Sequence, residues 1–175
     1  MRGRSALILA AAGLLSGCGS QSDHRPVVCV PSARPTLASH LQLPASVVSQ
    51  AASRGNNEMP QCVLTARPAA RRPVRVTVNL DNGPQPFFRL ERTAVEASQQ
   101  FGTERLYAAP ELIMGLGLDA DWFPDGNYVL TTDGVKLITV TVAWPGSSQA
   151  ARRALSIAVA RRFLGRLHHN PNAGY

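Results

Sequence analysis

The chain has 175 residues, of which 45% are hydrophobic and 17% are charged, and its formal net charge is +7. This length and apolar content suit one folded globular domain. The charge does not indicate nucleic-acid binding, because the arginines are scattered in pairs such as Arg71-Arg72 and Arg161-Arg162. No aromatic residues alternate with them, as a surface for single-stranded nucleic acid requires. A solvated basic surface, or attraction to anionic lipid headgroups, accounts better for the excess.

Residues 1–17 have the layout of a secretory signal peptide. Arg2 and Arg4 give a positively charged start, an apolar run follows over residues 5–15, and Gly17 is a small residue at its end. This run reaches about 16 Å as a helix, roughly half of the hydrocarbon core of a bilayer. It is therefore too short to remain in place as a transmembrane helix.

The end of this leader, Leu15-Ser16-Gly17-Cys18, resembles the bacterial lipobox, a Leu-small-small-Cys pattern. In that family of precursors the cysteine sulfur receives a diacylglyceryl group, and the leader is cut immediately before the cysteine. The resemblance implies that Cys18, carrying acyl chains such as palmitate, holds the protein on the extracytoplasmic face of a bacterial cell membrane. Cleavage leaves 175 − 17 = 158 residues with a net charge of 7 − 2 = +5. The alternative is an ordinary secreted protein that is cut nearby, with Cys18 incidental.

The two remaining cysteines, Cys29 and Cys62, form an even pair outside the cytosol, where disulfides form. We predict a Cys29–Cys62 disulfide. It closes a loop spanning 62 − 29 = 33 positions, which contributes about 3–4 kcal/mol in the chain-entropy model. A metal site is the alternative, although no Cys-x-x-Cys motif or nearby histidine pair supports it.

The first half of the mature chain predicts a tether, a helix and two strands. Residues 18–40 are rich in Pro, Ser and Arg, so we expect a flexible tether there and a globular domain over 41–167. Pro44 suits a first helical position and Gly55 suits a helix end, so a short helix is expected between them. Residues 62–65 read as a short strand. Valines alternate with polar residues over 74–80, which predicts a half-buried strand.

The second half predicts a helix, a hairpin and a closing helix. Residues 87–102 carry an apolar stripe and end at Gly102, as an amphipathic helix does. Asp133-Gly134 joins two β-rich runs and is a strong hairpin signal. A final helix follows, capped by Ser147 or Ser148. Residues 168–175 are expected to form a disordered tail, which includes the pair His168-His169.

The two halves have a similar order of elements. Each contains two strands followed by a helix, which suggests a ββα–ββα plan. The fold class expected is α+β, a two-layer sandwich of one mostly antiparallel sheet with helices on one face.

This layout resembles a family of small actinobacterial lipoproteins that is classed only as a domain of unknown function. The residues that carry the resemblance are Cys29, "LPASVVSQA", "QCVLT" and the Gly-x-Gly-x-x-Ala segment at residues 115–120. The chain departs from the pattern in its long Pro/Arg turn at residues 66–73. The resemblance implies a monomeric extracytoplasmic domain held at the membrane, and it brings no agreed catalytic residues.

No catalytic constellation stands out. The Gly-x-Gly-x-x-Ala segment does not fit a dinucleotide site, because it leads into a loop and strand pattern and not into a helix. Asp119, Asp121 and Asp125 are weak candidates for a calcium site, since Leu130 stands where an EF-hand needs a bidentate glutamate. They are more simply explained as acidic turn residues that flank a buried Trp122.

Three aromatic residues, Trp122, Phe123 and Trp144, lie beside expected strands. They are expected to fill the core, although one of them could line a ligand groove. The sequence therefore favours a non-catalytic envelope lipoprotein without a cofactor. It would bind a membrane and an envelope protein, a lipid or a cell-wall component. The alternatives are a small calcium-dependent extracytoplasmic enzyme and a carrier of a hydrophobic ligand.

Overall fold

A computed structural model of the chain describes residues 29–54, 60–68, 72–81 and 108–169. The helices in these ranges are α1 (Ala33–Leu41), the 3₁₀ turn η1 (Ala45–Val47) and α3 (Gln149–His169). The strands are β1 (Val48–Arg54), β2 (Pro60–Ala66), β3 (Val74–Asp81), β4 (Glu111–Leu112), β5 (Asp119–Phe123), β6 (Tyr128–Thr132) and β7 (Leu137–Ala143).

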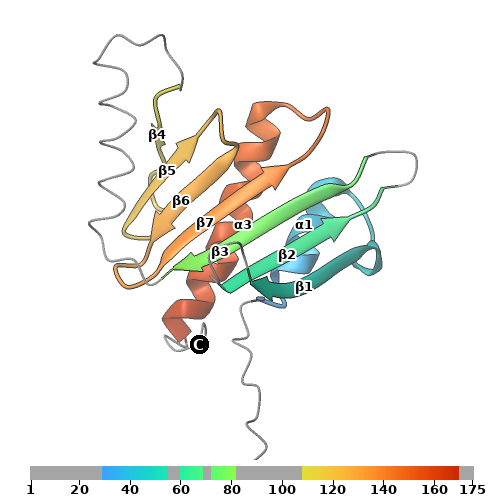
Figure 1. Cartoon of the computed structure of the whole chain (residues 1–175), viewed down its shortest axis with the longest axis horizontal. Helices are drawn as coiled ribbons and strands as arrows, with labels where there is room; N and C mark the ends of the chain where they lie inside the picture. Colours follow the sequence, from blue (N-terminus) through green and yellow to red (C-terminus); the bar gives the residue numbers. More distant parts are fainter. Residues whose placement is uncertain (1–28, 55–59, 69–71, 82–107, 170–175) are drawn as a thin grey trace, which may run out of the picture.

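The strands form one seven-stranded sheet in the order β1-β2-β3-β7-β6-β5-β4, and all neighbours are antiparallel (Figure 1). The two halves of the chain meet at β3 and β7, which pair from Arg75 opposite Ala143 to Asp81 opposite Leu137. Along both strands buried and more exposed residues alternate, as expected for strands with one face on the core. The predicted α+β class with an antiparallel sheet is confirmed.

Both described helices lie on the same side of the sheet (Figure 1). Helix α3 contacts β6 and β7, α1 contacts β1 and β2, and the two helices contact each other. Between helices and sheet lies a mainly aliphatic core with Trp122 and Phe163 as its fully buried aromatic residues; its other members include Val76, Val78, Val140, Val142, Leu155 and Val159. Each such side chain contributes about 1.5–3 kcal/mol when it is fully buried, so this layer dominates the stability of the fold.

The expected boundary between tether and domain, at residue 40, is wrong. Residues 33–41 form α1, and Ala33, Leu37 and Ala38 are buried in the core. Proline content suggested irregular structure here. Pro35, however, lies in the first turn of α1, where a backbone N–H has no intrahelical partner to lose. The globular domain therefore already includes Val30, which is 5% exposed.

The short helix expected between Pro44 and Gly55 is also wrong. Only residues 45–47 are helical, as η1, and residues 48–54 form β1. Strand β1 pairs with β2 along its whole length, from Val48 opposite Ala66 to Arg54 opposite Pro60. This pairing outweighs the weak local preference of the sequence for a helix.

Several other expected elements are present. The strands at residues 62–65 and 74–80, the hairpin turn at Asp133-Gly134 and the closing helix are confirmed. Helix α3 continues to His169, so the tail does not begin at residue 168. The expected helix at residues 87–102 and the leader at residues 1–17 lie outside the described residues. The ββα–ββα plan and the two-layer arrangement therefore stay predictions.

Candidate functional site

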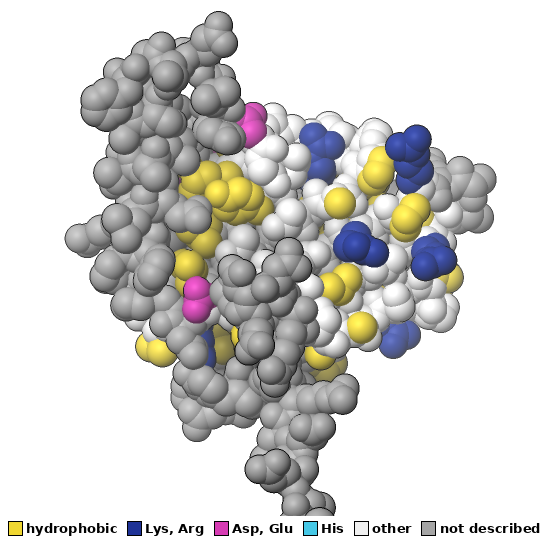
Figure 2. All heavy atoms as spheres, viewed as in Figure 1, with side chains coloured by type: hydrophobic (Ala, Val, Ile, Leu, Met, Phe, Trp, Pro, Cys, Tyr) yellow, Lys and Arg dark blue, Asp and Glu magenta, His cyan; other side chains and the backbone are white. Residues whose placement is uncertain are grey.

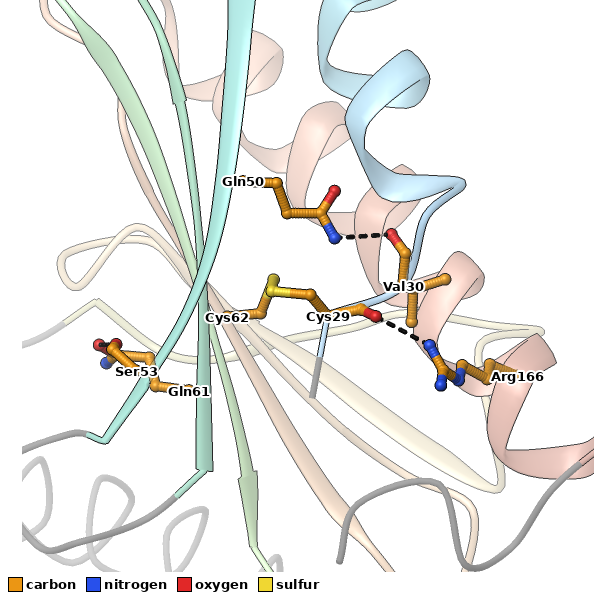
Figure 3. The surroundings of a disulfide bond; sticks show 7 residues. All are labelled: Cys29, Val30, Gln50, Ser53, Gln61, Cys62 and Arg166. Atoms are coloured by element: carbon orange, nitrogen blue, oxygen red, sulfur yellow. Dashed lines mark hydrogen bonds between the residues drawn. A yellow bond between two sulfur atoms is a disulfide. The ribbon is translucent and has the colours of Figure 1, made fainter. Parts of the chain in front are cut away.

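The best-defined feature outside the core is the attachment of the first described residues to the domain. Cys29 forms a disulfide with Cys62, and their Cα atoms are 5.0 Å apart (Figure 3). The predicted pairing is confirmed. Cys62 is fully buried in β2, on the face of the sheet that carries the core.

Two hydrogen bonds hold the backbone beside the disulfide (Figure 3). Arg166 of α3 donates from Nη1 to the carbonyl oxygen of Cys29 at 2.8 Å, and Gln50 of β1 donates from Nε2 to the carbonyl oxygen of Val30 at 3.2 Å. The same Val30 carbonyl accepts the N–H of Ala33 at 3.0 Å, where α1 begins. Side chains from β1, β2 and α3 therefore fix two consecutive residues at the entry to the domain.

The disulfide attaches to the interior of the sheet. Strand β2 is an interior strand that pairs with β1 on one side and with β3 on the other. The bond therefore joins the start of the described chain to an interior strand of the sheet and not to a strand at its edge.

The three candidate groove residues are not brought together. Trp122 is fully buried in the main core, and its indole N–H has no hydrogen-bond partner there. Phe123, the next residue along β5, belongs to the opposite face, where its ring stacks on Tyr128 at 4.5 Å between centroids. Trp144 follows β7 and is partly buried against the main core. A groove lined by all three does not form.

The face that carries Phe123 is not an open groove either. Phe123 and Leu130 are only 5% and 2% exposed, and Asp121 on the same face is 1% exposed. Aromatic residues beside strands were expected mainly to fill the core. For Trp122 that expectation is confirmed, and Phe123 belongs to a second, smaller cluster.

The three candidate metal-binding acids are spread along one hairpin. Asp119 and Asp121 lie on β5, two residues apart, whereas Asp125 lies in the turn beyond its far end and accepts the backbone N–H of Ala108. No group of three or more His, Cys, Asp or Glu side chains within the described ranges could hold a metal ion. The glycine segment before Asp119 leads into strand β5, as expected, and not into a helix.

Some contacts could not be read from the sequence. Nothing in the sequence links Arg166 to Cys29. Four large apolar side chains, Leu112, Met114, Leu118 and Val135, are exposed. The sequence gives one indication of this exposure, because Met114, Leu118 and Val135 each stand next to a glycine in a turn sequence.

Comparison with known proteins adds no family to this description. No protein-family model matches the chain, and neither a curated protein nor a solved structure matches it. The resemblance to the actinobacterial lipoproteins therefore stays a prediction. Among the described helices, none has both the length and the apolar character needed to cross a membrane.

Proposed function

We propose that this chain is a lipoprotein, anchored through Cys18 to the extracytoplasmic face of a bacterial cell membrane. Its domain has a non-catalytic binding or structural role in the cell envelope and acts as a monomer. Its partner is an envelope protein, a lipid or a cell-wall component. The proposal rests first on the lipobox-like sequence at residues 15–18.

The structural observation that best supports the proposal is the Cys29–Cys62 disulfide. Disulfides persist in oxidising compartments and are rare in the cytosol, so this bond favours a location outside it. The chain has three cysteines, and the disulfide uses two of them. Cys18 is left without an intramolecular cysteine partner, as a lipidated cysteine requires.

The attachment at Cys29 fits an anchored domain. Between Cys18 and Cys29 lie 29 − 18 = 11 backbone steps, which span at most about 36–40 Å when fully extended. A tether of this length keeps the domain close to the bilayer. The disulfide and the hydrogen bonds from Arg166 and Gln50 hold the inner end of the tether on three elements of the fold.

For the fold we also propose the ββα–ββα plan. The segment 87–102 would follow the β2–β3 hairpin as α3 follows the β6–β7 hairpin. The support for this proposal is the apolar stripe in the sequence of that segment.

The experiment that tests the anchor compares the full-length chain with C18A after expression in a bacterial host. A clickable fatty acid in the medium reports acylation, and fractionation reports location. The wild-type chain is expected to incorporate the label and to sediment with membranes, whereas C18A loses the label and leaves the membrane fraction. The matched control is S20A, two residues beyond the lipobox, which is expected to behave as wild type. Equal labelling and sedimentation of C18A and the wild type would show that Cys18 is not the anchor.

A further inference from the structure

Four exposed apolar side chains gather in two neighbouring segments of the chain. Leu112, Met114, Leu118 and Val135 are 56%, 81%, 70% and 67% exposed. They are four of the five exposed large hydrophobic residues in the part of the chain that the structure describes. Three lie in β4 and the loop that leads to β5, and Val135 lies in the β6–β7 turn. We call these four residues the apolar tip.

The loop that carries Leu118 is pinned to the β5–β6 hairpin. The backbone N–H of Leu118 donates to the Thr132 carbonyl at 2.8 Å, and the Thr131 hydroxyl donates to the Leu116 carbonyl at 3.1 Å. Leu116 is itself buried, at 2% exposed. A Cβ atom on Gly117 would lie 2.4 Å from the Thr132 carbonyl oxygen, so only glycine allows this close approach.

The turn that carries Val135 is equally fixed. One carboxylate oxygen of Asp133 accepts the backbone N–H groups of Val135 at 2.9 Å and of Lys136 at 2.7 Å. Leu118 lies over this turn, since its Cδ1 is 2.8 Å from where a Cβ on Gly134 would stand. Leu118 and Val135 therefore flank the same glycine on a rigid backbone. A preformed apolar surface loses little conformational entropy when it is covered, and exposed apolar side chains that lie together are a common feature of interaction sites.

The apolar tip lies at the end of the sheet at which β2, the strand that carries Cys62, begins. Thr132, which precedes the β6–β7 turn, pairs with Leu137, and Leu137 pairs with Asp81 at the end of β3. Strand β2 begins at this end, and Cys62 is its third residue. From β2 to β6 there are three steps in the strand order, or about 14 Å at roughly 4.8 Å per step. Cys62 is in register with Val78 and Val140, three residues along the strands from the row of Leu137, which adds about 10 Å in that direction.

The figures agree with this placement. In Figure 1 the β6–β7 turn, the end of α3 and the start of the described chain all lie towards the bottom of the view. In Figure 2 hydrophobic side chains reach the surface at several places of the same view, one of them at the lower left. The described chain thus begins near the end of the domain that presents the apolar tip.

We propose that the apolar tip rests in the surface of the bilayer that holds the lipid anchor. This inference depends on the anchor at Cys18. If the 11 backbone steps between Cys18 and Cys29 follow random-coil statistics, their end-to-end distance is about 17–20 Å, comparable to the separation between the tip and the disulfide. Once the acyl chains are inserted, the end of the domain that faces the membrane is therefore the end with the apolar tip. Exposed Leu, Met and Val side chains gain free energy at the boundary between headgroups and acyl chains.

The charges at this end favour an apolar contact over an electrostatic one. Asp119 and Asp133 flank the tip, and Lys136 follows Val135 in the same turn. The two signs offset each other, so the contact does not require anionic lipid. It is expected to form on uncharged phosphatidylcholine and to persist at high salt.

The test uses the full-length lipidated protein in phosphatidylcholine vesicles, with or without bromine on the upper acyl chains. V135W places an indole on the tip, and A143W places one at the opposite, exposed end of β7. The tryptophan fluorescence of the wild type, which comes from Trp122 and Trp144, is subtracted from the fluorescence of each variant. Bromine is expected to lower the added emission of V135W roughly two-fold, since interfacial side chains lie about 5–10 Å into the headgroup boundary. The added emission of A143W is expected to be unchanged.

L118W repeats the measurement at the other side of Gly134, in case V135W folds poorly. Flotation of the same vesicles separates the two proposals. If the protein floats but V135W and L118W are not quenched, or A143W is quenched equally, the orientation is wrong and the anchor stands. If the lipidated protein does not float with the vesicles, the anchor is wrong and this inference falls with it.

Discussion

Arg166 in the C-terminal part of α3 donates a 2.8 Å hydrogen bond to the carbonyl oxygen of Cys29, 137 positions earlier in the chain. The bond joins the end of the domain's last helix to the residue at which the tether enters. Arg166 is partly buried, and its guanidinium carries the charge that makes such a bond strong. It ties α3 to the same backbone that the disulfide ties to β2.

We expect R166A to lower the free energy of unfolding by about 1.5–3 kcal/mol, the usual contribution of a hydrogen bond to a charged group. Urea unfolding, followed by circular dichroism, measures the change. R161A is the matched control, because Arg161 is exposed on the same helix, and its effect should stay within about 0.5 kcal/mol. Equal effects of the two substitutions would mean that the contact to Cys29 contributes no stability.

The disulfide is expected to be the largest single contributor at the attachment. The double variant C29S/C62S should lose about 3–4 kcal/mol of stability, because the unfolded chain regains the freedom of the closed loop. Urea unfolding of the wild type with and without reductant provides an independent comparison. A reduced wild type that unfolds at the same urea concentration as the oxidised protein would contradict the prediction.

Two glycines in the loop before β5 give a matched pair. Gly117 and Gly115 both have positive φ, at +66° and +72°, but only Gly117 lacks space for a Cβ. G115A should therefore cost about 1 kcal/mol for backbone strain alone. G117A should cost clearly more, about 2–4 kcal/mol, because the loop must also move away from the Thr132 carbonyl. Thermal unfolding of G115A and G117A measures the difference. Equal melting temperatures would show that the close approach of Gly117 to the Thr132 carbonyl does not affect stability.

Trp122 has an unusual environment, since its indole is fully buried without a hydrogen-bond partner. W122F removes this unpartnered donor and keeps an aromatic ring, so its cost should stay below about 1.5 kcal/mol. W122A leaves a cavity and should cost about 3–5 kcal/mol. Urea unfolding measures the loss of stability in W122F and in W122A. A W122F variant as unstable as W122A would indicate that the indole N–H is satisfied by a buried water.

Local patterns in the sequence were sufficient for the centre of the sheet. The alternation at residues 74–80 and the Asp133-Gly134 turn each depend on neighbouring residues, and both were predicted correctly. The Cys29–Cys62 disulfide could be predicted because the chain was expected outside the cytosol and only two cysteines remain besides Cys18. These features need no knowledge of distant contacts.

The N-terminal part could not be predicted because its structure is decided by contacts far away in the sequence. Strand β1 exists because it pairs with β2, and α1 is stabilised by packing on α3 and the sheet. Neither partner is visible in a local window. The apolar tip was missed for a related reason, since the exposure of Leu118 and Val135 depends on how two loops meet.

The central claim is that Cys18 is acylated and becomes the first residue of the mature protein, and intact-mass spectrometry of the full-length gene product purified from bacterial membranes tests it most directly. The account predicts a polypeptide that begins at Cys18, carries the added mass of acyl chains and retains one disulfide. A polypeptide that still begins at Met1, with an unmodified Cys18, would contradict it.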